Sequence, residues 1–123
     1  METEITYEVP LPTATITQQQ VDDLLCTAFE GGITYWCGSA QVQGEWPEGA
    51  RWISDTLSRG ATIALHDMEG DEVYHLTLDK FLTGLAKACA FRKQSVDRFF
   101  DGHDAIEADI VVQFAVLGEI VYG

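Results

Sequence analysis

The side chains best suited to metal binding lie close together in one short stretch: His66, Asp67, Glu69, Asp71 and His75. Two imidazoles on the same face of a β-hairpin can share a zinc or nickel ion. Zinc sites need three or four protein ligands, however, and Asp67 is expected on the opposite face. The stretch therefore offers His66 and His75 as candidate metal ligands, with the alternative that both are solvated side chains beside an acidic turn. No cofactor is predicted.

A thiol nucleophile is the other chemistry that these residue types allow, because Cys37 could join His66 and Asp67. The residues flanking Cys37 match no nucleophile elbow, and the chain contains no glycine-rich phosphate loop. A cysteine between Trp36 and Gly38 is more typical of packing. The sequence thus predicts no catalytic residue and favours a protein that is not an enzyme.

Aromatic residues provide candidates for binding rather than for catalysis. Tyr35 and Trp36 follow two glycines, and exposed Tyr and Trp side chains are common anchors at interfaces. The alternative, which we favour, is that they fill the core, as large aromatics do in small domains. Trp46 and Trp52 flank a predicted loop, where they either face a partner or cover the core.

Basic residues are scarce, because the chain of 123 residues has 7 Lys and Arg against 20 Asp and Glu, for a net charge of -13. Such a charge argues against broad nucleic-acid binding, which needs a basic face, and against adsorption to anionic membranes. Arg92, Lys93 and Arg98 form a local basic cluster. These three side chains either pair with neighbouring acids or form a small anion site.

The elements that must position these residues predict a small α+β domain covering residues 1–123. An antiparallel sheet containing a 61–78 hairpin is expected to pack with about three helices, over 17–30, 78–91 and 104–117. Residues 1–12 are expected to form an N-terminal strand or arm, because residues 3–9 alternate between apolar and polar side chains. A short helix is expected over 52–60, a helical piece over 95–100 and a strand over 119–123, with a loop over 41–49.

Local patterns give two finer predictions. Thr17 followed by Gln20 is a capping box that begins the first helix. The turn at Glu69 and Gly70 pairs Leu65 with Tyr74 and Ile63 with Leu76, which gathers the apolar side chains on one face.

The last helix is apolar around much of its circumference. Its expected buried stripe consists of Ile106, Ile110, Val111, Phe114 and Leu117. This breadth predicts either a central helix or self-association into a homo-oligomer, through that helix or the C-terminal strand.

The string Gly31-Gly32-Ile33-Thr34-Tyr35-Trp36-Cys37 and the C-terminal string Gly118-Glu119-Ile120-Val121-Tyr122-Gly123 resemble those of small uncharacterised proteins encoded by tailed phages and prophages. The resemblance extends over most of the chain from Thr17 onward and leaves the N-terminal strand outside. It implies a viral accessory context and no catalytic activity.

Two alternative functions are compatible with these features of the sequence. The first is binding to a host protein, for example as an acidic inhibitor of a nucleic-acid-binding or defence system. The alternative is binding of a small nucleotide signal, which would need Tyr35 or Trp36 together with Arg92, Arg98 or Arg51. The sequence shows no signal peptide, no apolar stretch long enough to span a membrane and no CxxC motif among its three cysteines, so we expect reduced thiols and a cytoplasmic location, in the host if viral.

Overall fold

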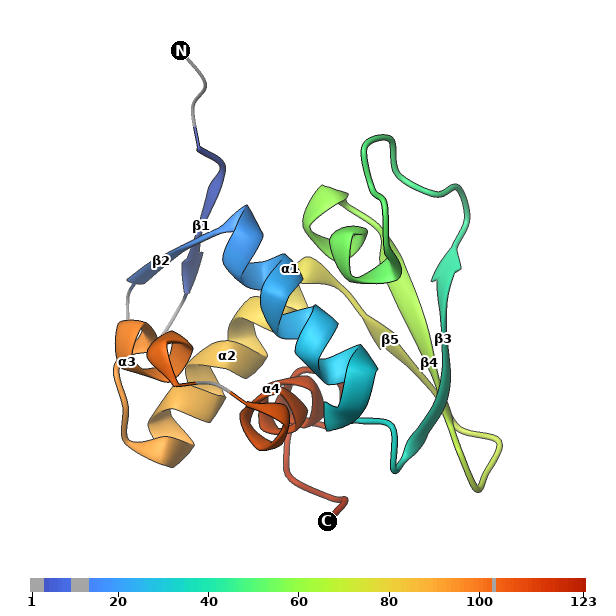
Figure 1. The fold of residues 1–123 in the computed structure, drawn as a ribbon. Coiled ribbons are helices and arrows are strands. Elements are labelled where there is room, and N and C mark those ends of the chain that lie inside the picture. Colours follow the sequence, from blue (N-terminus) through green and yellow to red (C-terminus); the bar gives the residue numbers. More distant parts are fainter. Residues whose placement is uncertain (1–3, 10–13, 103) are drawn as a thin grey trace.

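The chain forms a small α+β fold in which helices pack on one face of a three-stranded antiparallel sheet (Figure 1). The computed structural model describes residues 4–9, 14–102 and 104–123. The strands are β1 (Thr6–Val9), β2 (Ala14–Thr17), β3 (Cys37–Gln43), β4 (Thr62–Asp67) and β5 (Val73–Leu76). The helices are α1 (Gln18–Thr27), α2 (Leu78–Arg92), α3 (Val96–Asp101) and α4 (Ala105–Leu117). The predicted fold class is thus confirmed.

The central hairpin has the predicted register. Strands β4 and β5 pair Ile63 with Leu76 and Leu65 with Tyr74. Ile63, Leu65 and Leu76 are fully buried, so the expected apolar face is the one that meets the helices. Strand β3 pairs with the other edge of β4, which gives the order β3-β4-β5.

Helix α1 begins as its sequence predicts. The Thr17 side chain accepts a hydrogen bond from the backbone N–H of Gln20, whose side chain accepts one from the backbone N–H of Thr17, at 3.1 and 2.8 Å. The predicted helix 17–30 is regular only to Thr27, after which a π-helical turn over Ala28–Gly32 widens the coil. That turn packs on α4, and a Cβ atom on Gly32 would lie 2.7 Å from the carbonyl oxygen of Ala105. A side chain at this position would therefore push the turn away from α4.

Helix α4 lies at the centre of the fold, where it contacts α2, α1, β5 and the π-helical turn. Residues Ala108–Gln113 of this helix are all buried. The predicted stripe was partly wrong, because Ile106 is exposed to 62% while Asp109 and Gln113 are buried. Helix α2 approaches α4 closely at Gly84, where an added Cβ would lie 2.6 Å from the carbonyl oxygen of Val111.

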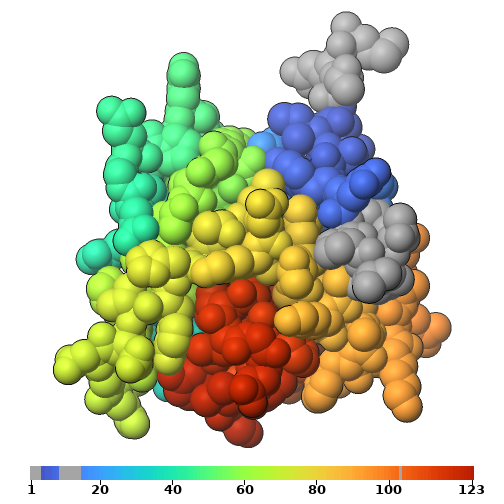
Figure 2. All heavy atoms as spheres, turned by 180° about the vertical axis from the view of Figure 1, so that it is seen from behind, coloured from blue at the N-terminus to red at the C-terminus, as the bar shows by residue number. Residues whose placement is uncertain are grey.

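Several element predictions need correction. Residues 119–123 form no strand; they run as irregular backbone along the surface between the hairpin and α2, where Figure 2 shows the C-terminal residues in red. Strand β3 reaches into the stretch predicted as the loop 41–49, and β2 was not predicted. The short helix expected over 52–60 consists of two 3₁₀ turns, Ile53–Asp55 and Leu57–Arg59. Strand β1 lies within the predicted strand 1–12, of which residues 1–3 and 10–12 fall outside the described residues.

Candidate functional site

The tight turn after the π-helical segment sends its two aromatic side chains in opposite directions. The backbone N–H groups of Trp36 and Cys37 both donate to the carbonyl of Ile33, at 3.1 and 2.8 Å. As a result Trp36 points into the core, where it is 2% exposed, and Tyr35 points outward, where it is 50% exposed. The two aromatic residues that the sequence presented together therefore have different roles.

Both side chains meet again at Asp109, a carboxylate on α4 that is only 8% exposed. Its Oδ2 accepts a hydrogen bond of 2.5 Å from the hydroxyl of Tyr35. Its Oδ1 accepts one of 2.8 Å from the indole Nε1 of Trp36 and one of 2.9 Å from the amide Nε2 of Gln113. All three donors are neutral, and no Lys, Arg or His of the described residues forms an ion pair with Asp109.

Gln113 extends this network to the C-terminal segment. It is fully buried, and its Oε1 accepts hydrogen bonds from the backbone N–H groups of Val121 and Tyr122, at 2.8 and 2.9 Å. The ring of Tyr122 stacks on the indole of Trp36 with centroids 4.8 Å apart, and its hydroxyl lies 3.0 Å from that of Tyr74. The C-terminal residues are thus docked on the fold by side-chain hydrogen bonds rather than by strand pairing.

Four residues of this network line a hollow of about 500 Å³, and we call their polar side chains its floor. Asp109, Gln113, Tyr35 and Tyr122 supply its polar groups. The other side chains of its wall are apolar and come from α2, α4 and the C-terminal segment: Phe91, Ala105, Ile106, Ile110 and Ile120. We call this the Asp109 hollow. Its volume is within the range of ordinary ligand sites, and a mostly apolar wall with a few polar groups is also typical of such sites.

The rim of the Asp109 hollow consists of exposed apolar side chains. Phe91 is 59% exposed and Ile106 is 62% exposed, and Ile120 is also exposed. Phe91 makes an edge-on contact with Phe114 behind it, with ring centroids 5.7 Å apart. Large apolar side chains gathered around a hollow are more informative than the scattered ones found on every surface.

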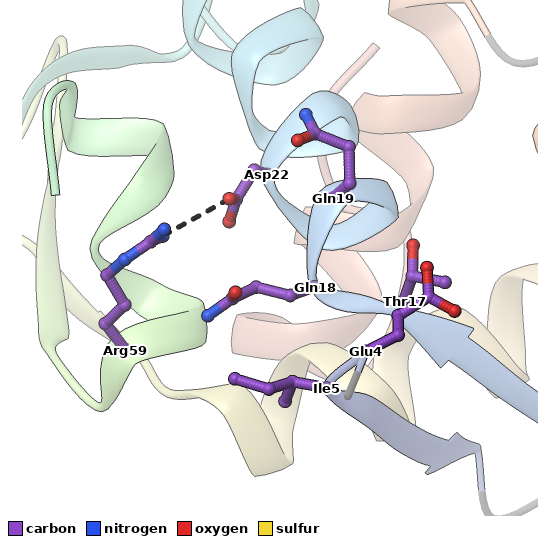
Figure 3. Close-up of a pocket in the computed structure, with 7 residues that line it drawn as sticks. All are labelled: Glu4, Ile5, Thr17, Gln18, Gln19, Asp22 and Arg59. Atoms are coloured by element: carbon purple, nitrogen blue, oxygen red, sulfur yellow. Dashed lines mark hydrogen bonds and ion pairs between the residues drawn. The ribbon is translucent and has the colours of Figure 1, made fainter. Parts of the chain in front are cut away.

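A second hollow of about 520 Å³ lies beside α1 and has a polar lining that includes Glu4, Gln18, Asp22 and Arg59 (Figure 3). Arg59 reaches across from the 3₁₀ turns to Asp22, with Nη1 and Oδ2 3.3 Å apart. The hydroxyl of Ser58 also donates to Asp22, at 2.7 Å. Burial raises the pKa of Asp22 despite these partners. This ion pair holds the 3₁₀ turns to α1, so we assign it a structural role.

Comparison of the chain with protein-family models, with curated proteins and with solved structures gave no match.

None of the remaining binding candidates from the sequence lines the Asp109 hollow. Trp46 is half exposed in the loop after β3, where its Nε1 donates to the carbonyl of Ala50 at 2.8 Å. Arg92 ends α2, and its neighbour Phe91 lies at the hollow. Arg98 lines a separate depression with Asp101 and Glu107. Neither arginine forms an ion pair with any residue that the structure describes.

The histidine and cysteine candidates are placed near one another without forming a reactive site. Cys37 is the ladder partner of Asp67, and His66 pairs with Ser39. The Cys37 thiol is buried and donates to the carbonyl of Ser39, and burial raises its pKa, which disfavours the nucleophilic thiolate. All three cysteines are free. In the part of the chain described, no group of three or more His, Cys, Asp or Glu side chains is arranged to hold a metal ion, around His66 and His75 included.

Sequence reasoning missed Asp109, Gln113, Phe91 and Ile106 as site residues. Asp109 and Gln113 did carry a signal, because they are polar residues four apart that interrupt the apolar run of the last helix. A polar pair at that spacing lies on one side of a helix and can hydrogen-bond internally. When the helix is central, such a pair must find further partners, which here are Tyr35, Trp36 and the C-terminal backbone.

The hydrogen bond between Tyr35 and Asp109 predicts a change in stability at alkaline pH. Burial and the neighbouring Asp109 raise the pKa of Tyr35 to about 12, from an ordinary value of 10.0. The unfolded chain loses this proton near pH 10 and the folded chain does not, so stability should fall as pH rises from 10 toward 12. We expect the free energy of unfolding, measured with urea, to fall less between pH 9 and pH 11 for Tyr35→Phe than for the unsubstituted protein. Equal losses would show that Tyr35 does not hold its proton in this way.

Proposed function

We propose that this protein is a non-enzymatic, phage-type accessory protein that acts by binding a host protein, and that the Asp109 hollow with its rim is the binding surface. The observation that carries the proposal is the combination of exposed Phe91 and Ile106 with a hollow whose polar side chains are held by hydrogen bonds. Interface hot spots favour such places, where an anchor side chain enters a pocket that excludes water. The phage context rests on the sequence resemblance.

The overall charge narrows the class of partner. At -13, the protein attracts basic surfaces and repels acidic ones, and the attraction speeds association at low salt. A host nucleic-acid-binding protein, with its basic face, fits this requirement. The apolar rim would supply the affinity, and the acidic body would supply steering and selection against acidic proteins.

Binding of a small ligand remains the alternative, because the volume of about 500 Å³ suits one. A nucleotide signal is the poorer fit. The Asp109 hollow has a carboxylate at its floor, and none of the described residues that line it is Lys, Arg or His. Phosphate groups would therefore meet negative charge without a compensating base.

The rim also suggests how self-association would occur. Ile106 at the start of α4 and Ile120 in the C-terminal segment belong to the two regions from which a homo-oligomer was expected. A homo-oligomer formed through these residues would compete with the host partner. Light scattering should then show a smaller particle mass for Ile106→Ser than for the unsubstituted protein, and a monomer for both at micromolar concentration would exclude self-association through the rim.

Capture from a host lysate with matched variants tests the proposal. Ile106→Ser removes an exposed apolar side chain from the rim. Met68→Ser removes one of similar exposure, 52%, from the hairpin turn, which does not line the hollow. We expect a host protein that is retained by the unsubstituted protein and by Met68→Ser, and lost with Ile106→Ser. Capture that is the same with all three proteins would contradict the assignment of the surface. A nucleotide released from the purified protein would favour the alternative.

A further inference from the structure

We propose that the Asp109 hollow receives a lysine or arginine side chain of the protein partner, with Asp109 as its counter-charge. This inference rests on the proposed function and specifies the chemistry of the recognised group. The aromatic and aliphatic wall would contact the stem of that side chain.

The floor of the hollow carries the carboxylate of Asp109, which no cation of the described residues balances. Buried carboxylates in proteins are normally paired with a cation or hold a metal. Among the residues that the structure describes, Asp109 has only neutral donors, which are Tyr35, Trp36 and Gln113. Its Oδ2 accepts a single hydrogen bond from the described residues, the one from Tyr35, and a carboxylate oxygen can accept a second. Because Tyr35 and Asp109 both line the hollow, a cation entering it would approach this oxygen.

The wall of the hollow is mostly apolar, which suits the aliphatic stem of a basic side chain. Lysine and arginine bury an aliphatic stem against apolar surface while the charged head reaches a polar group. Phe91, Ile106 and Ile120 supply that apolar surface. The rings of Tyr35 and Phe91 can add a cation–π contribution, which is larger in a desolvated site. Arginine should bind more tightly than lysine, because its guanidinium is more weakly hydrated and presents several donors in one plane.

The electrostatic field of the whole protein also favours a basic partner. The chain carries 20 acidic and 7 basic residues, so a basic segment approaches a protein that attracts it as a whole. A second copy of this chain would bring another body of charge -13 to the hollow, so self-association through the rim should be weaker than binding of a basic partner.

The test uses Nα-acetyl-arginine methylamide as the probe and the corresponding citrulline compound as its uncharged match. The indole N–H of Trp36 donates to Asp109, so its resonance in a ¹⁵N-labelled sample reports on the site. We expect the arginine compound to shift this resonance with a dissociation constant on the order of millimolar, typical of a single anchor. The citrulline compound should bind at least about five-fold more weakly. Equal binding of the two compounds, or no shift with either, would overturn the inference.

Variants separate charge from folding. Asp109→Asn keeps the size of the side chain and should abolish the preference for arginine over citrulline. Ile106→Lys places a cation at an exposed rim position, where folding should be unaffected, and should repel the probe, whereas Ile106→Gln is its neutral match and should not. Retained preference in Asp109→Asn, or equal binding by the two Ile106 variants, would contradict a role for charge. Binding of butylammonium in the absence of binding by the arginine compound would assign the hollow to a small amine and overturn the proposal.

The capture experiment distinguishes this inference from the proposed function. A host protein that is lost with Ile106→Ser but retained at full affinity by Asp109→Asn would support the proposed binding surface. It would contradict only the proposal that Asp109 binds a basic side chain. A host protein retained by both variants would contradict both proposals.

Discussion

Replacing Gln113 with leucine should lower the free energy of unfolding by about 3 kcal/mol, because several buried polar groups lose their partner at once. Gln113 is fully buried and accepts from the N–H groups of Val121 and Tyr122 while donating to Asp109. Leucine has similar volume and can satisfy none of these groups. The C-terminal segment should then detach, which denaturant unfolding and faster hydrogen exchange at Val121 and Tyr122 would detect.

The matched control is Gln41→Leu, at an exposed position on β3. The same chemical change there should alter stability by no more than about 0.5 kcal/mol. A similar small effect for Gln113→Leu would mean that the network around Asp109 does not hold the C-terminal segment.

Gly84→Ala should also destabilise the protein, although alanine is the better helix former by about 1 kcal/mol. An added Cβ would lie 2.6 Å from the carbonyl oxygen of Val111 and 2.7 Å from the backbone nitrogen of Ala115. Both are backbone atoms of α4, so the helices must separate. Forcing a methyl group into such a contact typically costs about 1–3 kcal/mol, and the tightness of this one places it toward the upper end of that range.

Gly31→Ala provides the comparison for Gly84→Ala, because an added Cβ at Gly31 meets no atom within 4 Å. Thermal unfolding should show a clear fall in melting temperature for Gly84→Ala and little change or a rise for Gly31→Ala. A melting temperature for Gly84→Ala at or above that of the unsubstituted protein would contradict the close approach of α2 and α4.

The sequence predicted local features well because their causes are local. The capping box at Thr17 and Gln20 depends on residues three apart, and the 61–78 hairpin on alternation around one turn. Both are present as predicted. The apolar breadth of the last helix indicated either a central position or self-association, and the helix does lie at the centre of the fold.

Failures occurred where distant residues decide the structure. Residues 119–123 contain an apolar run typical of a strand, yet Gln113 binds the backbone N–H groups of Val121 and Tyr122, and no strand of the described residues pairs with them. Ile106 fits the apolar stripe of α4 but lies at the end of the helix beyond the core, so it is exposed. No local rule brings Tyr35 to Asp109, 74 positions along the chain.

In the described part of the chain, no helix is long and apolar enough to cross a bilayer. The proposed occupant of the Asp109 hollow is a protein partner, and its affinity for the rim can be measured directly.

The most direct test of this account is the dissociation constant of the captured host protein for three forms of the chain. Isothermal titration should give equal affinities for the unsubstituted protein and Met68→Ser, and an affinity at least about ten-fold weaker for Ile106→Ser, since an anchor residue at an interface contributes about 1.4 kcal/mol or more. Equal affinities for all three, with folding of each verified by thermal unfolding, would show that the partner binds elsewhere and would contradict the central claim.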